Sequence, residues 1–302
     1  MKRGHYRNPR LDHSVQTGDP VVGEVSLDVG KVFWLTGMIA GTLAGFYWMT
    51  LDALAVFVFF TAVTLCLGHS LGMHRRLIHR SYECSRWLEY LFVHLGVLVG
   101  MAGPLGMLRT HDTRDWAQRQ TRCHPYFSHD ERWFKDAYWQ LFCSIKLLAP
   151  PDIRVEPEIQ RDPVYPWMEQ YWMCQQIPWA LFLYALGGLP WVCWGICARV
   201  TVSVIGHWFI GYFAHNVGDR SWHVEGAAVQ GHNVRWASLI TMGESWHNNH
   251  HAFPGSARLG VKQGEWDPGW WVLCGLVKLD LAKNPVLPGM LPQRNELMAV
   301  YR

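Results

Sequence analysis

The chain has 302 residues, half of them apolar and only 17% charged. Soluble domains carry about 25% charged residues, so a surface of ordinary polarity is excluded, while a mean hydropathy of −0.02 excludes a chain buried entirely in lipid. The net charge of +3 gives no nucleic-acid footprint, and there is no low-complexity tract or repeat that would indicate a disordered, collagen-like or solenoid chain. Composition therefore predicts a protein partly embedded in a bilayer and partly facing water.

The N-terminal segment and the cysteines exclude further classes. The first 30 residues are polar and lack an apolar run, so no cleaved signal peptide is expected there. The eight cysteines include no C-x-x-C pair, which argues against a cysteine zinc site or a redox motif.

Four runs are apolar and long enough to cross a bilayer, which takes about 20 residues. They cover residues 33–49, 51–73, 177–198 and 200–217. Thr50 alone joins the first two and Arg199 alone joins the last two, so two tight helical hairpins are expected. A weaker run over residues 88–108 contains a Gly-Pro break and is predicted to be interfacial or re-entrant.

Positive charge predicts the orientation. All 27 lysines and arginines except Arg199 lie in the N-terminal segment, between residues 74 and 176, or after residue 217. Because positive charge favours the cytoplasmic side, both termini are expected there. We therefore expect one all-α membrane domain over residues 1–302, with four transmembrane helices in two hairpins and a cytoplasmic helical cap (74–176 and 218–302). The alternative is a soluble protein with four buried helices.

Histidines cluster beside the ends of these runs. His247, His250 and His251 have the i, i+3, i+4 spacing that places three imidazoles on one helical face, where they can converge on one point. His74 and His79 are five residues apart, about 140° around an α-helix, and would converge only at a frayed end or by flanking two metals. Imidazole suits iron, copper, zinc and nickel, and a set so poor in cysteine is not a typical structural zinc site.

Other histidines are assigned other environments. Those within or near the apolar runs are expected to be interfacial, and four more are expected to be exposed to solvent. The first set is His69, His94 and His207, and the second is His5, His13, His223 and His232.

The order of these motifs resembles the membrane fatty-acid desaturases of the acyl-CoA desaturase type. H-x-x-x-x-H follows the second run, a box led by His111 comes next, and W-H-N-N-H-H-A-F-P lies after the last run. The most specific stretch is Gly243–Pro254, supported by Met73–Tyr82 and by Asn233–Trp236. The resemblance covers roughly residues 30–280.

The resemblance implies an oxidoreductase of lipid metabolism. Two histidine-ligated irons, O₂ and an external reductant would introduce a double bond into a long-chain fatty acyl group, either acyl-CoA or lipid-linked. An alkyl C–H has no useful acidity, so side-chain acid–base chemistry alone cannot remove it. The ligands carried over are His74, His79, His111, His215, His247, His250 and His251.

The second box departs from the family pattern. H-x-x-H-H is expected, but Arg114 and Asp115 replace its last two histidines, and Gly211 stands where an Asn is frequent. Three explanations compete. Asp115 is itself a ligand, or His124 or His129 completes the site, or one metal site is weakened. Asp115 is alternatively an ion-pair partner of a neighbouring arginine.

Several functional alternatives stay open at this stage. The rival enzyme is a related membrane di-iron oxygenase that hydroxylates an alkyl or other lipid substrate, and a third reading is a non-catalytic lipid-binding homologue. No substrate-binding residue is assigned. Four arginines are candidates either for phosphate binding or for positive-inside anchoring (Arg75, Arg76, Arg80 and Arg109).

The chain lacks a haem module, a cluster motif and a flavin fingerprint. A separate ferredoxin, rubredoxin or small haem protein is therefore expected to deliver electrons. A bacterial inner membrane is the favoured location, with the endoplasmic reticulum as the alternative.

Overall fold

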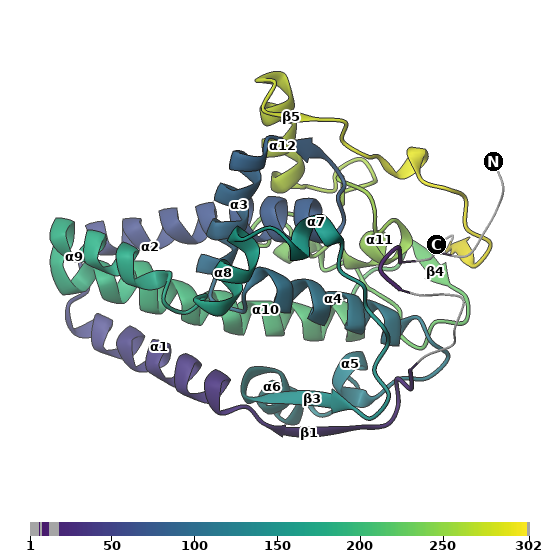
Figure 1. Ribbon diagram of the computed structural model, residues 1–302, viewed down its shortest axis with the longest axis horizontal. Coiled ribbons are helices and arrows are strands. Elements are labelled where there is room, and N and C mark those ends of the chain that lie inside the picture. Colours follow the sequence, from purple (N-terminus) through teal and green to yellow (C-terminus); the bar gives the residue numbers. More distant parts are fainter. Residues whose placement is uncertain (1–5, 7, 12–17, 301–302) are drawn as a thin grey trace.

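The computed structural model describes residue 6, residues 8–11 and residues 18–300. It is mostly helical, and its longest helices lie side by side along the long axis of the molecule (Figure 1). His5 and His13 fall outside the described residues. The long helical segments are α1 (Val29–Tyr47), α2 (Leu51–Val63) with its continuation η1 (Thr64–Ile78), and α9 (Gln176–Val192) with its continuations η2 (Cys193–Ala198) and α10 (Arg199–Asn216).

Three helices in the described chain are long and apolar enough to cross a membrane. They are Val29–Tyr47, Leu51–Ile78 and Gln176–Asn216. α1 ends at Tyr47 and α2 begins at Leu51, and the Thr50 side chain accepts a hydrogen bond from the Ala53 amide and so caps α2.

The connection expected at Arg199 is wrong. Helical backbone breaks instead at Gly188, whose φ of 67° and ψ of −158° are open chiefly to glycine. Leu183 packs against Gly195, although a straight helix would hold these residues about 18 Å apart, so the chain folds back at Gly188.

Arg199 lies inside the helix and is 1% exposed. It donates hydrogen bonds to the carbonyl oxygens of Gly195 and Leu98 and to Gln176 Oε1. Its charge suggested a loop, but these acceptors satisfy the guanidinium within the fold.

Glycines set the distance between η1 and α3 (Arg86–Leu98). A Cβ at Gly68 would lie 2.3 Å from the Leu95 carbonyl carbon, and one at Gly72 would lie 2.4 Å from the Phe92 carbonyl oxygen. Small residues at this spacing let two helix backbones touch, as in membrane helix pairs. The segment predicted to be interfacial, residues 88–108, covers most of α3 and the start of α4 (Pro104–Gln118). The two helices are separated at residues 99–103.

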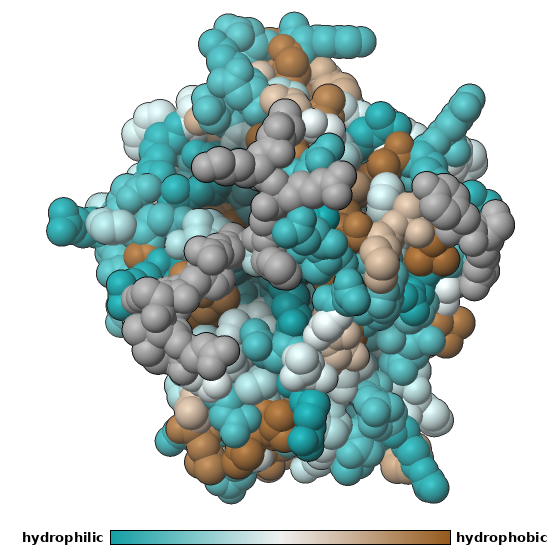
Figure 2. Space-filling view, turned by 90° about the vertical axis from the view of Figure 1, so that its right-hand side faces the viewer, coloured by the Kyte–Doolittle hydropathy of each residue, from teal (hydrophilic) through white to brown (hydrophobic). Residues whose placement is uncertain are grey.

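The remaining elements lie around the long helices, and α11 and β4 lie towards the end of the molecule away from α9 (Figure 1). Figure 2 views this end and shows a mostly hydrophilic surface. Three antiparallel two-stranded sheets are present in the described chain, so an all-α fold is wrong in this detail. They pair β1 (Gly23–Leu27) with β3 (Cys143–Leu147), β2 (Glu83–Cys84) with β5 (Ala282–Lys283), and β4 (Trp222–Val224) with β6 (Leu297–Ala299). The short helices are α5 (Pro125–Ser128), α6 (Trp133–Phe142), α7 (Pro157–Gln160), α8 (Val164–Gln170), η3 (Arg235–Ala237), α11 (His247–Ala252), α12 (Pro268–Lys278) and η4 (Pro288–Met290).

Candidate metal centre

Four histidines from three segments form the first group. His74 lies in η1, His79 follows it, His111 comes from α4 and His250 from α11. Each offers one ring nitrogen, and these nitrogens lie within 4.8 Å of one another. The ring centroids are 4.6–5.9 Å apart for all six pairs.

The geometry of η1 explains how His74 and His79 meet. This segment is a π-helix, in which each amide bonds to the carbonyl five residues earlier, and the His79 amide donates to the His74 carbonyl at 3.0 Å. Five residues then make slightly more than one turn, so the two rings lie on nearly the same face, 4.7 Å apart. The angle of about 140° expected between the two residues in an α-helix is wrong, because a π-helix has more residues in each turn.

Three histidines form the second group. His215 lies at the end of α10, and His247 and His251 lie on α11. The Nε2 atom of His247 is 3.0 Å from the Nε2 atoms of both His215 and His251. His215 Nδ1 donates to the Gly211 carbonyl at 2.7 Å, so its Nε2 carries a lone pair directed into the group.

Helix α11 divides its histidines between the two groups. The i, i+4 pair, His247 and His251, faces His215, whereas His250 faces His74 and His79. The expectation that all three converge on one point is therefore wrong. The rings of His247 and His250 are still only 5.7 Å apart, so the two groups are adjacent.

The donor atoms fit metal ions. His79 Nε2 and His250 Nδ1 are buried and have no hydrogen-bond partner in the described structure. Burial lowers the pKa of His79, His250 and His251 well below the usual histidine value, so these rings are neutral and present lone pairs. Seven imidazoles in two groups are a donor set that suits iron or another transition metal.

Glu244 supports the first group, and sequence reasoning did not single it out. Its Oε2 lies 2.6 Å from His74 Nδ1, and its Oε1 lies 3.6 Å from Arg75 Nε. Burial alone would raise the pKa of Glu244, but His74 and Arg75 outweigh it and lower the pKa to about 2. A carboxylate on the far nitrogen of a ligating histidine fixes the direction of the ring.

The Asp115 carboxylate pairs with an arginine and does not join the histidines, as a metal ligand would. Its carboxylate takes two contacts from Arg119 Nε, at 2.8 and 2.9 Å, and it lies outside both histidine groups. The ion-pair reading of Asp115 thus has direct geometric support. His124 also stays apart, with its Nδ1 accepting from the Tyr126 amide.

His129 approaches the second group without joining it. Arg114 Nη1 lies 2.6 Å from His129 Nε2, and because a guanidinium only donates, that nitrogen must accept. His129 Nδ1 therefore carries the proton and donates to Asp136 Oδ2 at 2.9 Å. A Cβ at Gly211 would lie 3.8 Å from the His129 ring, so two departures from the family pattern, Arg114 and Gly211, surround this ring.

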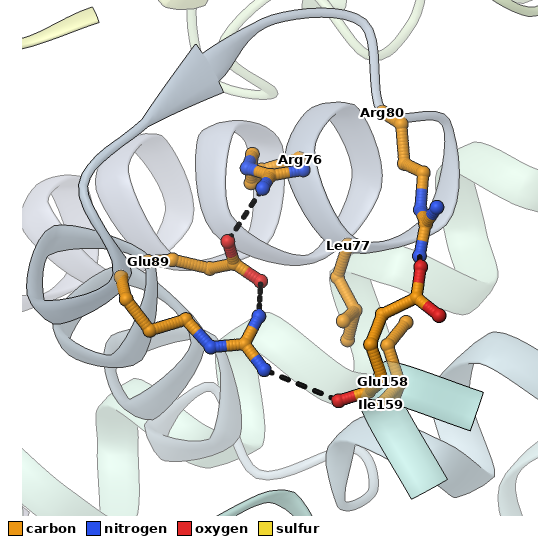
Figure 3. Close-up of a pocket in the computed structure, with 7 residues that line it drawn as sticks. Arg76, Leu77, Arg80, Glu89, Glu158 and Ile159 are labelled. Carbon is orange, nitrogen blue, oxygen red and sulfur yellow. Dashed lines mark hydrogen bonds and ion pairs between the residues drawn. The ribbon is translucent and has the colours of Figure 1, made fainter. Parts of the chain in front are cut away.

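Three of the four candidate phosphate-binding arginines form ion pairs with carboxylates. Arg75 is 1% exposed and pairs with Asp267 at 2.7 Å. Arg76 and Arg80 line a cavity of about 140 Å³. Figure 3 shows Arg76 paired with Glu89 and Arg80 paired with Glu158 there. Only Arg109 of the four is exposed on α4 without such a role.

The remaining histidines also have local environments. His94 is hydrogen-bonded to Gln175 and to Trp179, and His69 packs edge-on against His207 with ring centroids 5.2 Å apart. His223 and His232 are partly buried, so the exposure predicted for them is wrong.

A helical chain with bilayer-length helices and seven imidazoles in two adjacent groups is typical of histidine-rich membrane metal proteins. The sequence profile described as "Fatty acid desaturase" matches residues 50–259. The chain therefore belongs to the fatty acid desaturase family, and it is an oxidoreductase.

Named relatives agree with this assignment. The sn-2 palmitoyl-lipid 9-desaturase of Nostoc sp. (strain 36) is 32% identical over 236 residues, covering 78% of this chain and 82% of the relative. The sn-1 stearoyl-lipid 9-desaturase of Anabaena variabilis is 34% identical over 222 residues, covering 74% and 79%. That of Synechocystis sp. (strain ATCC 27184 / PCC 6803 / Kazusa) is 35% identical over 237 residues, covering 75% and 69%.

Proposed function

We propose that this desaturase acts on the acyl chain of an intact membrane lipid and introduces its double bond at position 9. The support is that relatives similar over about three quarters of the chain are named lipid 9-desaturases. The acyl-CoA substrate class is the alternative, since an acyl-CoA C20 Delta5-desaturase of Anemone leveillei is also similar, at 28% identity.

The observation that carries the proposal is the pair of histidine groups, His74, His79, His111 and His250 in one and His215, His247 and His251 in the other. Each group would hold one iron. When bound, the two irons supply the oxidising power to take hydrogen from adjacent unactivated CH₂ groups with O₂. One CH₂–CH₂ unit, O₂, two electrons and two protons give one CH=CH unit and two waters.

The residues of the chain direct and shield this chemistry. Glu244 fixes His74, and the Gly211 carbonyl fixes His215, so each group has an imidazole of defined direction. We propose a separate ferredoxin, rubredoxin or small haem protein as the electron donor.

The proposed topology has four crossings in two hairpins. We place the second hairpin at Gly188, where the helical backbone of the third long helix breaks. The histidine groups and both described ends would lie on the cytoplasmic side of a bacterial inner membrane.

Expression in a host whose lipids are fully saturated tests the function. Under aerobic conditions, mass spectrometry of dimethyl-disulfide adducts should show monoenes with the double bond at carbon 9, esterified in lipids. His250→Ala should abolish them and His124→Ala, outside both groups, should not. Oxygenated chains in place of monoenes would favour the hydroxylase, and unchanged lipids would overturn the proposal.

A further inference from the structure

Two buried arginines outside residues 50–259, the part that matches the family, contact the segments that carry the histidines. Arg10 belongs to the N-terminal strap, defined as Tyr6 and Asn8–Leu11. Arg294 belongs to the C-terminal tail, residues 282–300. Their side chains are 3% and 8% exposed.

Arg10 caps the end of η1 beside the first group. Its Nη2 donates to the Leu77 carbonyl at 3.1 Å and its Nη1 to the Ile78 carbonyl at 2.9 Å, directly before His79. Nη1 also lies 3.2 Å from Asp112 Oδ2, and Asp112 follows His111 in the chain. One guanidinium therefore ties together the backbone before one histidine and the residue after another. Glu156 Oε2 accepts from the Nε of Arg10 at 2.9 Å and forms a second ion pair with it.

Arg294 caps the end of α11 in the same way. Its Nη1 donates to the carbonyls of His251 and Ala252 at 3.0 and 2.8 Å, and its Nε pairs with Glu296 at 2.7 Å. The last carbonyls of a helix have no internal donor, and a cation there also interacts favourably with the helix dipole.

Tyr6 joins the strap to the tail. Its amide donates to Glu296 Oε1 at 2.9 Å, and its ring lies 5.3 Å from the Arg294 guanidinium carbon. On the same ring, the Arg119 guanidinium carbon is 4.3 Å from the centroid, and Arg119 is the partner of Asp115. The strap thus spans from the first histidine group to the helix that supplies both.

We propose that Arg10 and Arg294 are positioning residues that hold the histidine-bearing backbone and thereby retain the bound metals. Without Arg10, the carbonyls of Leu77 and Ile78 lose a side-chain donor. Without Arg294, the Ala252 carbonyl loses its side-chain donor and the His251 carbonyl keeps only the longer contact from Arg119 Nη2, at 3.4 Å. The adjoining helix end then frays, so the imidazoles lose their fixed direction. This inference rests on the proposed metal role of the two groups.

Iron release from the full-length purified enzyme into a chelator, followed by elemental analysis, tests the inference. Each arginine is changed in two single-group backgrounds, His247→Ala, which leaves the first group, and His79→Ala, which leaves the second. Arg10→Ala should speed release about tenfold or more from the first group and leave the second unchanged. Arg294→Ala should speed release from both, because α11 supplies both groups.

Two further variants separate positioning from folding. Arg154→Ala, whose side chain is 67% exposed and pairs with Asp152, should leave release unchanged. Arg10→Lys keeps a charge beside Asp112 but cannot donate to two carbonyls in fork geometry, so it should fold and still release iron faster than wild type.

The outcomes are distinct. Equal acceleration by Arg10→Ala in both backgrounds would mean general destabilisation and would overturn the inference, as would rates equal to those of Arg154→Ala. A wild-type enzyme that binds no iron would overturn the proposed metal role together with the inference. Retained iron in wild type with unaffected arginine variants would overturn the inference alone.

Discussion

The ring of His129 lies flat against the ring of His215, with centroids 5.0 Å apart and planes 13° apart. Arg114 and Asp136 hold His129 in place from its two nitrogens. Arg114 stands where the resemblance leads one to expect a histidine. Its side chain contacts His129 and so supports the ring that stacks on His215.

Loss of this support should weaken the second group. We expect His129→Ala to lower iron from two towards one per chain, because His215 loses its stacked neighbour and Arg114 loses its acceptor. Elemental analysis of the purified enzyme measures this, with His124→Ala as the matched control from the same loop region. Two irons retained in His129→Ala would show that the stacking does not hold the site.

Asp115→Ala should retain its iron. Its carboxylate is bound to Arg119, outside both groups, so its loss removes an ion pair rather than a ligand. We expect a loss of about 1–3 kcal/mol in stability, because the partly buried Arg119 is left without its charge partner. Thermal melting and iron content are measured on the same sample, and a loss of one iron would restore the ligand hypothesis for Asp115.

Glu244→Gln should weaken metal binding in the first group. The substitution keeps the shape but removes the charge that lies 2.6 Å from His74 Nδ1, and outer partners of this kind contribute about 10- to 100-fold in metal affinity. Competition with chelators of graded strength gives the affinity. Glu158→Gln, at an exposed carboxylate that pairs with Arg80, is the control and should not change it.

Gly72→Ala should destabilise the fold. Its new methyl group would lie 2.4 Å from the Phe92 carbonyl oxygen, and separating η1 from α3 costs roughly 1–3 kcal/mol. Gly275→Ala is the matched control in α12, where a Cβ meets nothing within 4 Å and a gain of about 0.5–1 kcal/mol is expected from helix propensity. Melting curves in detergent compare the two, and equal melting temperatures would contradict the packing argument.

Much of the site could be read from the chain because its signals are local. Apolar runs marked the long helices, and the histidine spacings with their order marked the family. The break at Gly188 was not predicted, because the charge of Arg199 placed the connection at that residue instead. Only the structure shows that buried carbonyls accept hydrogen bonds from Arg199 inside the helix. The sequence also missed Glu244, which no spacing rule connects to His74.

By itself, the sequence determined the family, the membrane-length helices and the seven imidazoles, because these depend on composition and on neighbours along the chain. Only the tertiary structure decided how the imidazoles divide. The π-helical turn brings His74 and His79 together, and α11 sends His250 to one group and His251 to the other. It alone showed that Arg10 and Arg294, at opposite ends of the chain, meet the same centre, because such contacts depend on chain folding and leave no periodic trace in the sequence.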